Sequence, residues 1–284
     1  MHQNLLNWIR RDMNRNRIEE RLKTLKQNKE KTFVAYITAG YPSPDYFETI
    51  MLALDEAGVD IVEVGVPFSD PVGDGPVIQD ASYHALLKGT TPTKVLEWIA
   101  NVREKTEIPI LLFTYFNPIL VQGIPPFLKK SAQVGVDGIL CVDLPIEESD
   151  TYKTEAEKNR LSTVFLVAPN SPEERIQHIV QKCSGFVYYV SRLGVTGEKD
   201  NIANDLSTSV ERIKKYTDLP VLVGFGISKP QHASFVASVS DGVIVGSAFV
   251  RYLKEHTDNS QWKDDFVKYV KSLVDATKKE KESK

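Results

Sequence analysis

The sequence has little cysteine, no long apolar run and no excess of positive charge. Its 284 residues include two cysteines, Cys141 and Cys183, which are too few for a disulfide framework. No stretch approaches the roughly 20 apolar residues that a membrane-spanning helix needs. The formal net charge of −3 offers no basic surface to nucleic acid or to an anionic membrane. We therefore expect a cytoplasmic protein that binds neither nucleic acid nor membrane.

Apolar segments with strand character alternate with segments of helical character. Hydrophobic residues make up 42% of the chain and charged residues 26%, as in ordinary globular proteins. Several helical segments follow a cap residue and a proline, such as Ser43-Pro44 and Thr91-Pro92. The predicted strands are 33–39, 61–66, 110–115, 138–142, 163–167, 186–190, 221–223 and 242–245. The predicted helices are 46–57, 93–105, 126–134, 148–159, 173–182, 207–216, 230–239 and 261–276.

Both faces of the predicted strands are apolar, which favours a parallel sheet covered on both sides. Eight successive β–α units predict an α/β fold of the (β/α)8 TIM-barrel type, formed by residues 1–284 as a single domain. A doubly wound open sheet is the alternative, although its edge strands would need a polar face. Residues 1–30 predict a helical extension that caps the barrel floor, and residues 278–284 predict a flexible tail. The triplet Gly-Val-Asp ends a helix and begins a strand twice, at Gly58 and at Gly135.

Two carboxylates lie around the end of the second predicted strand. Glu63 stands inside the apolar strand, where a charge is costly unless it is paired or used. Asp74 lies in the following loop, which is rich in proline and glycine and typical of an active-site loop. An ion pair of Glu63 with a lysine and turn roles for Asp70 and Asp74 are the alternatives.

Glycines follow the seventh and eighth predicted strands, where barrels often bind phosphate. Gly226 and Gly246 leave backbone N–H groups accessible to an anion, and Ser247 can begin a short helix that points at it. These segments contain no lysine or arginine, so N–H groups and dipoles would provide most of the binding. The alternative is that the glycines simply end strands. Asp143, after the fourth strand, braces a loop or takes part in catalysis, and no histidine spacing indicates a metal site.

Several motifs resemble the tryptophan synthase alpha chain family, and the likeness extends from about Phe33 to Val250. The most specific is the loop Pro-Phe-Ser-Asp-Pro. The motifs, in order, are Val64-Gly-Val-Pro-Phe-Ser-Asp-Pro71, Asp74-Gly-Pro76, Tyr115-Phe-Asn-Pro118, Gly194-Val-Thr-Gly197 and Gly224-Phe-Gly-Ile-Ser228.

The resemblance implies a lyase that cleaves indole-3-glycerol phosphate to indole and glyceraldehyde 3-phosphate without a cofactor or metal. It implies an α2β2 tetramer with a beta chain, in which pyridoxal phosphate belongs only to the beta chain. Glu63 would be the acid–base group, with a pKa raised by burial, and Asp74 its partner, which would stay ionised. The other positions implied are Tyr188 in the active site, Gly197, Gly226, Gly246 and Ser247 at the phosphate, Thr196 on the loop closing over the substrate, and Asp70 on the loop facing the beta chain. Apolar walls for indole are predicted at Phe33, Tyr115, Leu140 and Tyr188.

Some positions depart from the family pattern. Val72-Gly73 stands where Leu-Ala is frequent, Leu193 stands where a small or polar residue is common, and the N-terminal segment is longer than usual. The extra glycine is expected to loosen the Asp74 loop. Three other functions remain open: a sugar-phosphate isomerase, a non-catalytic activator of a beta chain, and a stand-alone indole-producing lyase.

Overall fold

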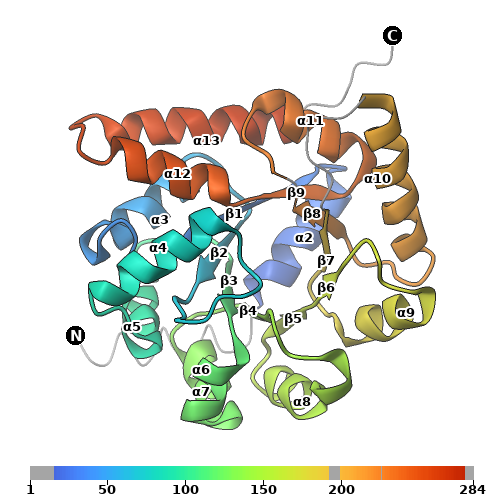
Figure 1. Cartoon of the computed structure of the whole chain (residues 1–284), viewed down its shortest axis with the longest axis horizontal. Coiled ribbons are helices and arrows are strands. Elements are labelled where there is room, and N and C mark those ends of the chain that lie inside the picture. The colour runs from blue at the N-terminus through green and yellow to red at the C-terminus, as the bar shows by residue number, and fades with distance from the viewer. Residues whose placement is uncertain (1–15, 192–198, 225, 279–284) are drawn as a thin grey trace.

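Figure 1 shows the computed structural model, which describes residues 16–191, 199–224 and 226–278, with the backbone alone for 199–204. The strands are β1 (Thr32–Thr38), β2 (Ile61–Gly65), β3 (Ile110–Thr114), β4 (Gly138–Cys141), β5 (Ser162–Val164), β6 (Leu166–Val167), β7 (Val187–Val190), β8 (Val221–Gly224) and β9 (Gly242–Val245). The helices are α2 (Arg17–Gln27), α3 (Phe47–Glu56), α4 (Pro76–Leu87), α5 (Pro92–Val102), α6 (Phe116–Gln122), α7 (Ile124–Gln133), α8 (Asp150–Lys158), α9 (Glu173–Lys182), α10 (Lys199–Lys214), α11 (Pro230–Val239), α12 (Ser247–His256) and α13 (Trp262–Lys278).

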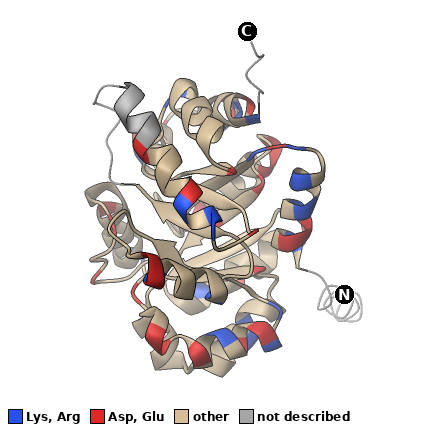
Figure 2. Ribbon diagram, turned by 90° about the vertical axis from the view of Figure 1, so that its right-hand side faces the viewer, with Lys and Arg blue, Asp and Glu red and all other residues tan. Residues whose placement is uncertain are grey.

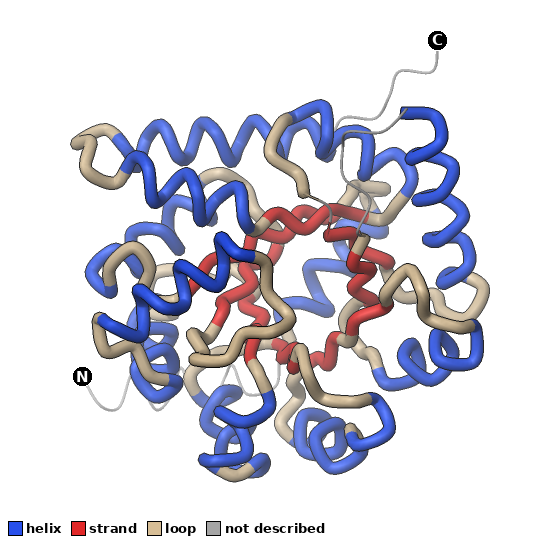
Figure 3. The backbone as a smooth tube through the Cα atoms, in the orientation of Figure 1, coloured by secondary structure: helices blue, strands red, loops and turns tan. Residues whose placement is uncertain are grey.

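The strands form a parallel barrel surrounded by helices, as the ring in Figure 3 shows. Their order is β5-β4-β3-β2-β1-β9-β8-β7-β6, so the sheet begins and ends on strands that are consecutive in the chain. Only Phe165 separates β5 from β6, and its carbonyl accepts the N–H of Tyr188 on β7. The predicted barrel is therefore confirmed, with the fifth predicted strand divided in two, and the doubly wound alternative is excluded.

The helices agree less closely with the sequence predictions. Two helices, α4 and α6, are absent from the predicted ranges, although His84 of α4 was expected to lie in a helical segment. Proline in the first turn of α4, at Pro76, is nonetheless an ordinary start signal. The helix predicted at 207–216 begins earlier, at Lys199, and the short helix expected from Ser247 extends to His256.

The core has two apolar layers because successive strand residues point to opposite faces. The outer layer fills the space between the barrel and its helices. The inner layer crosses the barrel interior with one residue from each strand position around the ring, when β5 and β6 are counted together. Its members are Val34, Ile61, Leu111, Leu140, Val164, Phe186, Leu222 and Ile244.

Helix α2 caps the floor of the barrel, as predicted for the N-terminal extension, and is visible through the ring in Figure 3. Its buried residues Ile18 and Leu22 pack against the inner layer. Residues 1–15 lie outside the described part of the chain.

Both Gly-Val-Asp triplets end in an aspartate that holds α2. The Asp137 carboxylate accepts from Arg17 Nη1 at 2.9 Å, and the Asp60 carboxylate accepts from Arg21 Nη2 at 2.6 Å. Each aspartate also accepts the N–H of a residue in the neighbouring strand, Ile110 for Asp137 and Phe33 for Asp60. The repeat therefore joins the floor helix to the start of four strands.

The outer surface is mixed in charge: acidic and basic residues are interspersed over the helices in the view of Figure 2. None of the described helices combines the length and the apolar character needed to cross a bilayer.

Candidate active site

A cavity of about 440 Å³ opens at the carboxyl end of the strands. Its floor follows from strand periodicity, because the residue two positions after each inner-layer residue again points into the barrel. One such residue comes from each strand position, and all of them line the cavity. They are Tyr36, Glu63, Phe113, Val142, Leu166, Tyr188, Gly224 and Gly246.

Glu63 is the only carboxylate in that ring of residues. It lies between Tyr36 and Leu111 in the strand register and is 1% exposed. Its Oε1 has no hydrogen-bond partner, and no described lysine or arginine forms an ion pair with it, so the structural ion pair considered from the sequence is wrong for this part of the chain. Burial and then the nearby Asp74 carboxylate raise the pKa of Glu63 from 4.5 to about 8. At neutral pH it is therefore largely protonated.

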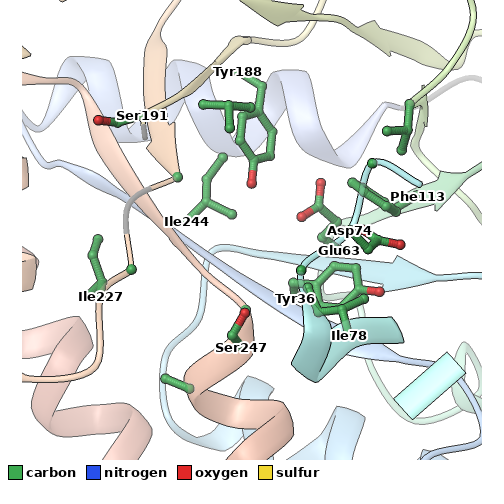
Figure 4. A pocket seen from close by; sticks show the side chains of 18 of the residues that line it. Tyr36, Glu63, Asp74, Ile78, Phe113, Tyr188, Ser191, Ile227, Ile244 and Ser247 are labelled. Carbon is green, nitrogen blue, oxygen red and sulfur yellow. The ribbon is translucent and has the colours of Figure 1, made fainter. Parts of the chain in front are cut away.

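Asp74 reaches the same cavity from the loop after β2, and Figure 4 shows its side chain with those of Glu63, Tyr36 and Tyr188 around one space. The Tyr115 hydroxyl donates to Asp74 Oδ2 at 3.0 Å. Burial raises the pKa of Asp74 from 3.8 to about 6, although the Tyr115 hydrogen bond lowers it. Asp74 thus stays mainly ionised at neutral pH, as expected, although its pKa lies closer to neutral than that of an aspartate in a polar loop.

Gly73 brings its loop into close contact with Tyr115, and the expectation that it loosens the loop stays a prediction. Its N–H donates to the Tyr115 hydroxyl at 3.0 Å, so Tyr115 joins two successive residues of the loop. A Cβ at this position would lie 2.8 Å from Val142 Cγ1 and 3.3 Å from the Tyr115 hydroxyl. The absence of a side chain at Gly73 therefore lets the loop approach Tyr115 closely.

The opposite side of the cavity is lined by the glycine segments after β8 and β9. Gly226 and Gly246 both face the cavity, and a Cβ on Gly226 would meet no atom within 4 Å. Ser247 is the first residue of α12, with Gly246 as its N-cap. Backbone N–H groups and the positive end of the helix dipole thus point at this space, as an anion site requires.

The remaining predicted residues have different outcomes. Tyr188 lines the cavity, its hydroxyl against Gly224. Thr196 and Gly197 lie outside the described residues. Asp70 is exposed and accepts from Ser69 Oγ. Asp143 braces the start of α6, since its carboxylate accepts the Phe116 N–H at 2.7 Å.

The predicted apolar walls are partly wrong. Phe33 belongs to the outer layer, where its ring centroid lies 6.3 Å from that of Phe249, and Leu140 belongs to the inner layer below the cavity. The error at Phe33 concerns which face of the strand points inward, whereas Leu140 points inward but lies one layer below the cavity. Tyr115 does not line the cavity and instead contacts the site by its hydrogen bond to Asp74. The walls that sequence reasoning missed, Tyr36 and Phe113, stand two residues after Val34 and Leu111, so the period of two along each strand was the available signal.

Comparison with known proteins agrees with these motifs. The family model of the tryptophan synthase alpha chain matches residues 22–279. The tryptophan synthase alpha chain of Geotalea daltonii is 47% identical over 239 residues, which cover 84% of this chain and 90% of that protein. The alpha chain of Solibacter usitatus is 42% identical over 249 residues, covering 88% and 93%.

Solved structures show the same similarity in three dimensions. The tryptophan synthase subunit alpha of Legionella pneumophila superposes with a TM-score of 0.85 at 34% identity, covering 93% of this chain and 98% of that one. A chain of tryptophan synthase from M. tuberculosis, in its aminoacrylate-bound form, gives 0.83 at 31% identity, covering 93% and 100%. With the barrel, the two carboxylates and the glycine-lined pocket in place, the chain belongs to the tryptophan synthase alpha chain family, a lyase family of tryptophan biosynthesis.

Proposed function

We propose that this chain cleaves indole-3-glycerol phosphate to indole and glyceraldehyde 3-phosphate, with Glu63 as the acid–base group. The observation that supports this role most directly is a buried carboxyl group with an unpartnered oxygen and a pKa of about 8. Protonated Glu63 gives its proton to the indole ring carbon that bears the glycerol chain. The resulting carboxylate takes the proton of the hydroxyl on the adjacent side-chain carbon as the C–C bond breaks, which leaves indole and an aldehyde.

Asp74 stabilises the charge that this protonation creates. The indole nitrogen becomes positively charged when the ring carbon gains a proton, and an ionised carboxylate that accepts its N–H lowers the energy of that state. The hydrogen bond from Tyr115 keeps Asp74 oriented and favours its ionised form. Tyr188, Tyr36 and Phe113 provide aromatic walls for the indole ring.

The phosphate lies at the other end of the cavity. Gly226, Gly246 and Ser247 supply backbone N–H groups and a hydroxyl there. By the family resemblance Gly197 also binds the phosphate and Thr196 belongs to the loop that closes over the substrate, and both lie outside the described residues. In this proposal the two ends of the substrate lie on opposite sides of the cavity, and the bond that is cleaved faces Glu63. Every step uses side chains and N–H groups of this chain, with no cofactor or metal.

The chain acts as the alpha subunit of a cytoplasmic α2β2 tetramer, with a beta chain bound beside the Asp74 loop. In support, large apolar side chains are exposed next to that loop: Val72 is 84% exposed, Tyr83 60% and Leu87 67%. With Asp70 they line one surface hollow. Apolar side chains grouped in this way are typical of a protein interface.

Indole release from indole-3-glycerol phosphate tests the proposal. The purified chain is assayed with and without a beta chain, beside Glu63→Gln and the exposed control Glu104→Gln. Indole from the wild type and the control but not from Glu63→Gln, increased by the beta chain, supports both the chemistry and the partner. No indole from any variant with a matched beta chain overturns the reaction. Equal rates with and without the beta chain would favour a stand-alone lyase.

A further inference from the structure

The phosphate end of the cavity contains one cation that sequence reasoning did not find. Arg251, on α12, lines the same cavity as Gly226, Gly246 and Ser247. It is the only lysine or arginine among the described residues that line this cavity, and Glu63 and Asp74 are the only carboxylates. The cavity therefore has two acids at the β2 side and one guanidinium at the α12 side.

Helix geometry directs Arg251 toward the site. It follows Ser247 by four residues, so the two side chains share one face of α12. Long side chains on a helix lean toward its N-terminus and cover the turn before their own Cα. The guanidinium of Arg251 is thus carried back over the first turn of α12, where the free N–H groups are.

The charge of Arg251 is available for a ligand. No described carboxylate forms an ion pair with it, whereas Lys254 on the same helix is held by Asp80 at 2.7 Å. The charge of Arg251 acts on the hydroxyl of Tyr269 on α13, whose pKa it lowers against the larger raising effect of burial. That hydroxyl donates to the Ser228 carbonyl at 2.9 Å, and Ser228 also lines the cavity.

We propose that Arg251 is a substrate-binding residue that pairs with the phosphate of the substrate and fixes which end of the cavity the phosphate enters. The inference rests on the proposed function, because it requires a phosphorylated substrate at this site. A guanidinium presents a planar pair of donors that matches phosphate oxygens. Repulsion from the two acids and attraction to Arg251 then favour the same orientation of the substrate.

Kinetics with two substrates separate this role from a structural one. Indole-3-glycerol phosphate and its dephosphorylated form are compared for the wild type, Arg251→Gln and Arg251→Lys, with Lys254→Gln as the matched control. For Arg251→Gln the KM for the phosphorylated substrate should rise roughly three- to tenfold with kcat nearly unchanged. The kcat/KM for the dephosphorylated substrate should stay the same. Added salt should reduce the difference in KM between the wild type and Arg251→Gln for the phosphorylated substrate. Arg251→Lys should keep part of the wild-type affinity.

Binding of glycerol 3-phosphate, measured by calorimetry, tests the same contact without chemistry. The Kd of Arg251→Gln should rise by a similar factor, while that of Lys254→Gln should not change. An unchanged Kd and KM in Arg251→Gln, or an equal loss with both substrates, would overturn the role of Arg251 alone. Failure of the wild type to bind glycerol 3-phosphate would overturn the phosphate site itself. Normal glycerol 3-phosphate binding without indole release would instead contradict the proposed reaction and leave the phosphate contact standing.

Discussion

Replacing Glu63 by glutamine is expected to abolish indole release and to stabilise the fold increasingly as the pH rises. The carboxyl group is 1% exposed, and its pKa is raised from 4.5 to about 8. An acid whose folded-state pKa is raised holds its proton in the folded protein while the unfolded chain releases it. The free energy of unfolding of the wild type therefore falls as the pH rises from about 4.5 toward 8 and then levels off.

The size of this effect follows from the shift in pKa. A change from 4.5 to about 8 corresponds to about 5 kcal/mol of lost stability above pH 8, and to about 3 kcal/mol at pH 7. Glutamine is neutral at every pH and removes this term. For a chain of this size each kcal/mol raises the melting temperature by roughly 2 °C, so the gain for Glu63→Gln is about 10 °C at pH 9.

The assay is thermal unfolding of the wild type and Glu63→Gln at pH 5, 7 and 9, with Glu104→Gln as an exposed control. The amide at position 63 has donors that the protonated acid lacks, which can shift the whole curve but cannot change its dependence on pH. The difference between Glu63→Gln and the wild type should therefore grow from pH 5 to pH 9. A constant difference would refute the reasoning, because it would mean that Glu63 titrates near its ordinary pKa.

Further predictions concern the pH dependence, the loop and the floor. Since catalysis needs ionised Asp74 and protonated Glu63, kcat/KM for indole release should peak between about pH 6 and 8, and a flat profile from pH 5 to 9 would contradict these roles. Tyr115→Phe should move the acidic limb of that profile to higher pH, because the hydrogen bond that it removes lowers the pKa of Asp74 in the wild type. Gly73→Ala should shift the limb in the same direction, since its Cβ would lie 2.8 Å from a methyl group of Val142 and would push the loop away from Tyr115. An unshifted limb in both variants would show that the Tyr115 hydrogen bond does not set the pKa of Asp74. Asp137→Ala should cost about 3–5 kcal/mol in urea unfolding, because it removes the carboxylate that pairs with buried Arg103 and one of the two that pair with Arg17, and a loss below 1 kcal/mol would argue against the ion pairs.

Much of the fold was readable from local pattern. Short β-branched runs separated by helical segments predicted every strand position of the barrel, because strands buried on both faces have a distinctive composition. The division at Phe165 was not readable, since it depends on which neighbour each half of the strand pairs with. The start of α4 was missed because Gly75 and Pro76 at its first turn are equally typical of a loop.

The sequence by itself determined the parallel barrel, the floor helix and the importance of Glu63, because each depends on a residue's own neighbours: an apolar run, an amphipathic segment, a charge inside a strand. Only the tertiary structure decided which side chains share the cavity. Tyr115 and Asp74 are 41 residues apart, and Arg251 lies in a helix far from both. Barrel closure brings them together, since the carboxyl ends of parallel strands meet at one end whatever their separation in the chain.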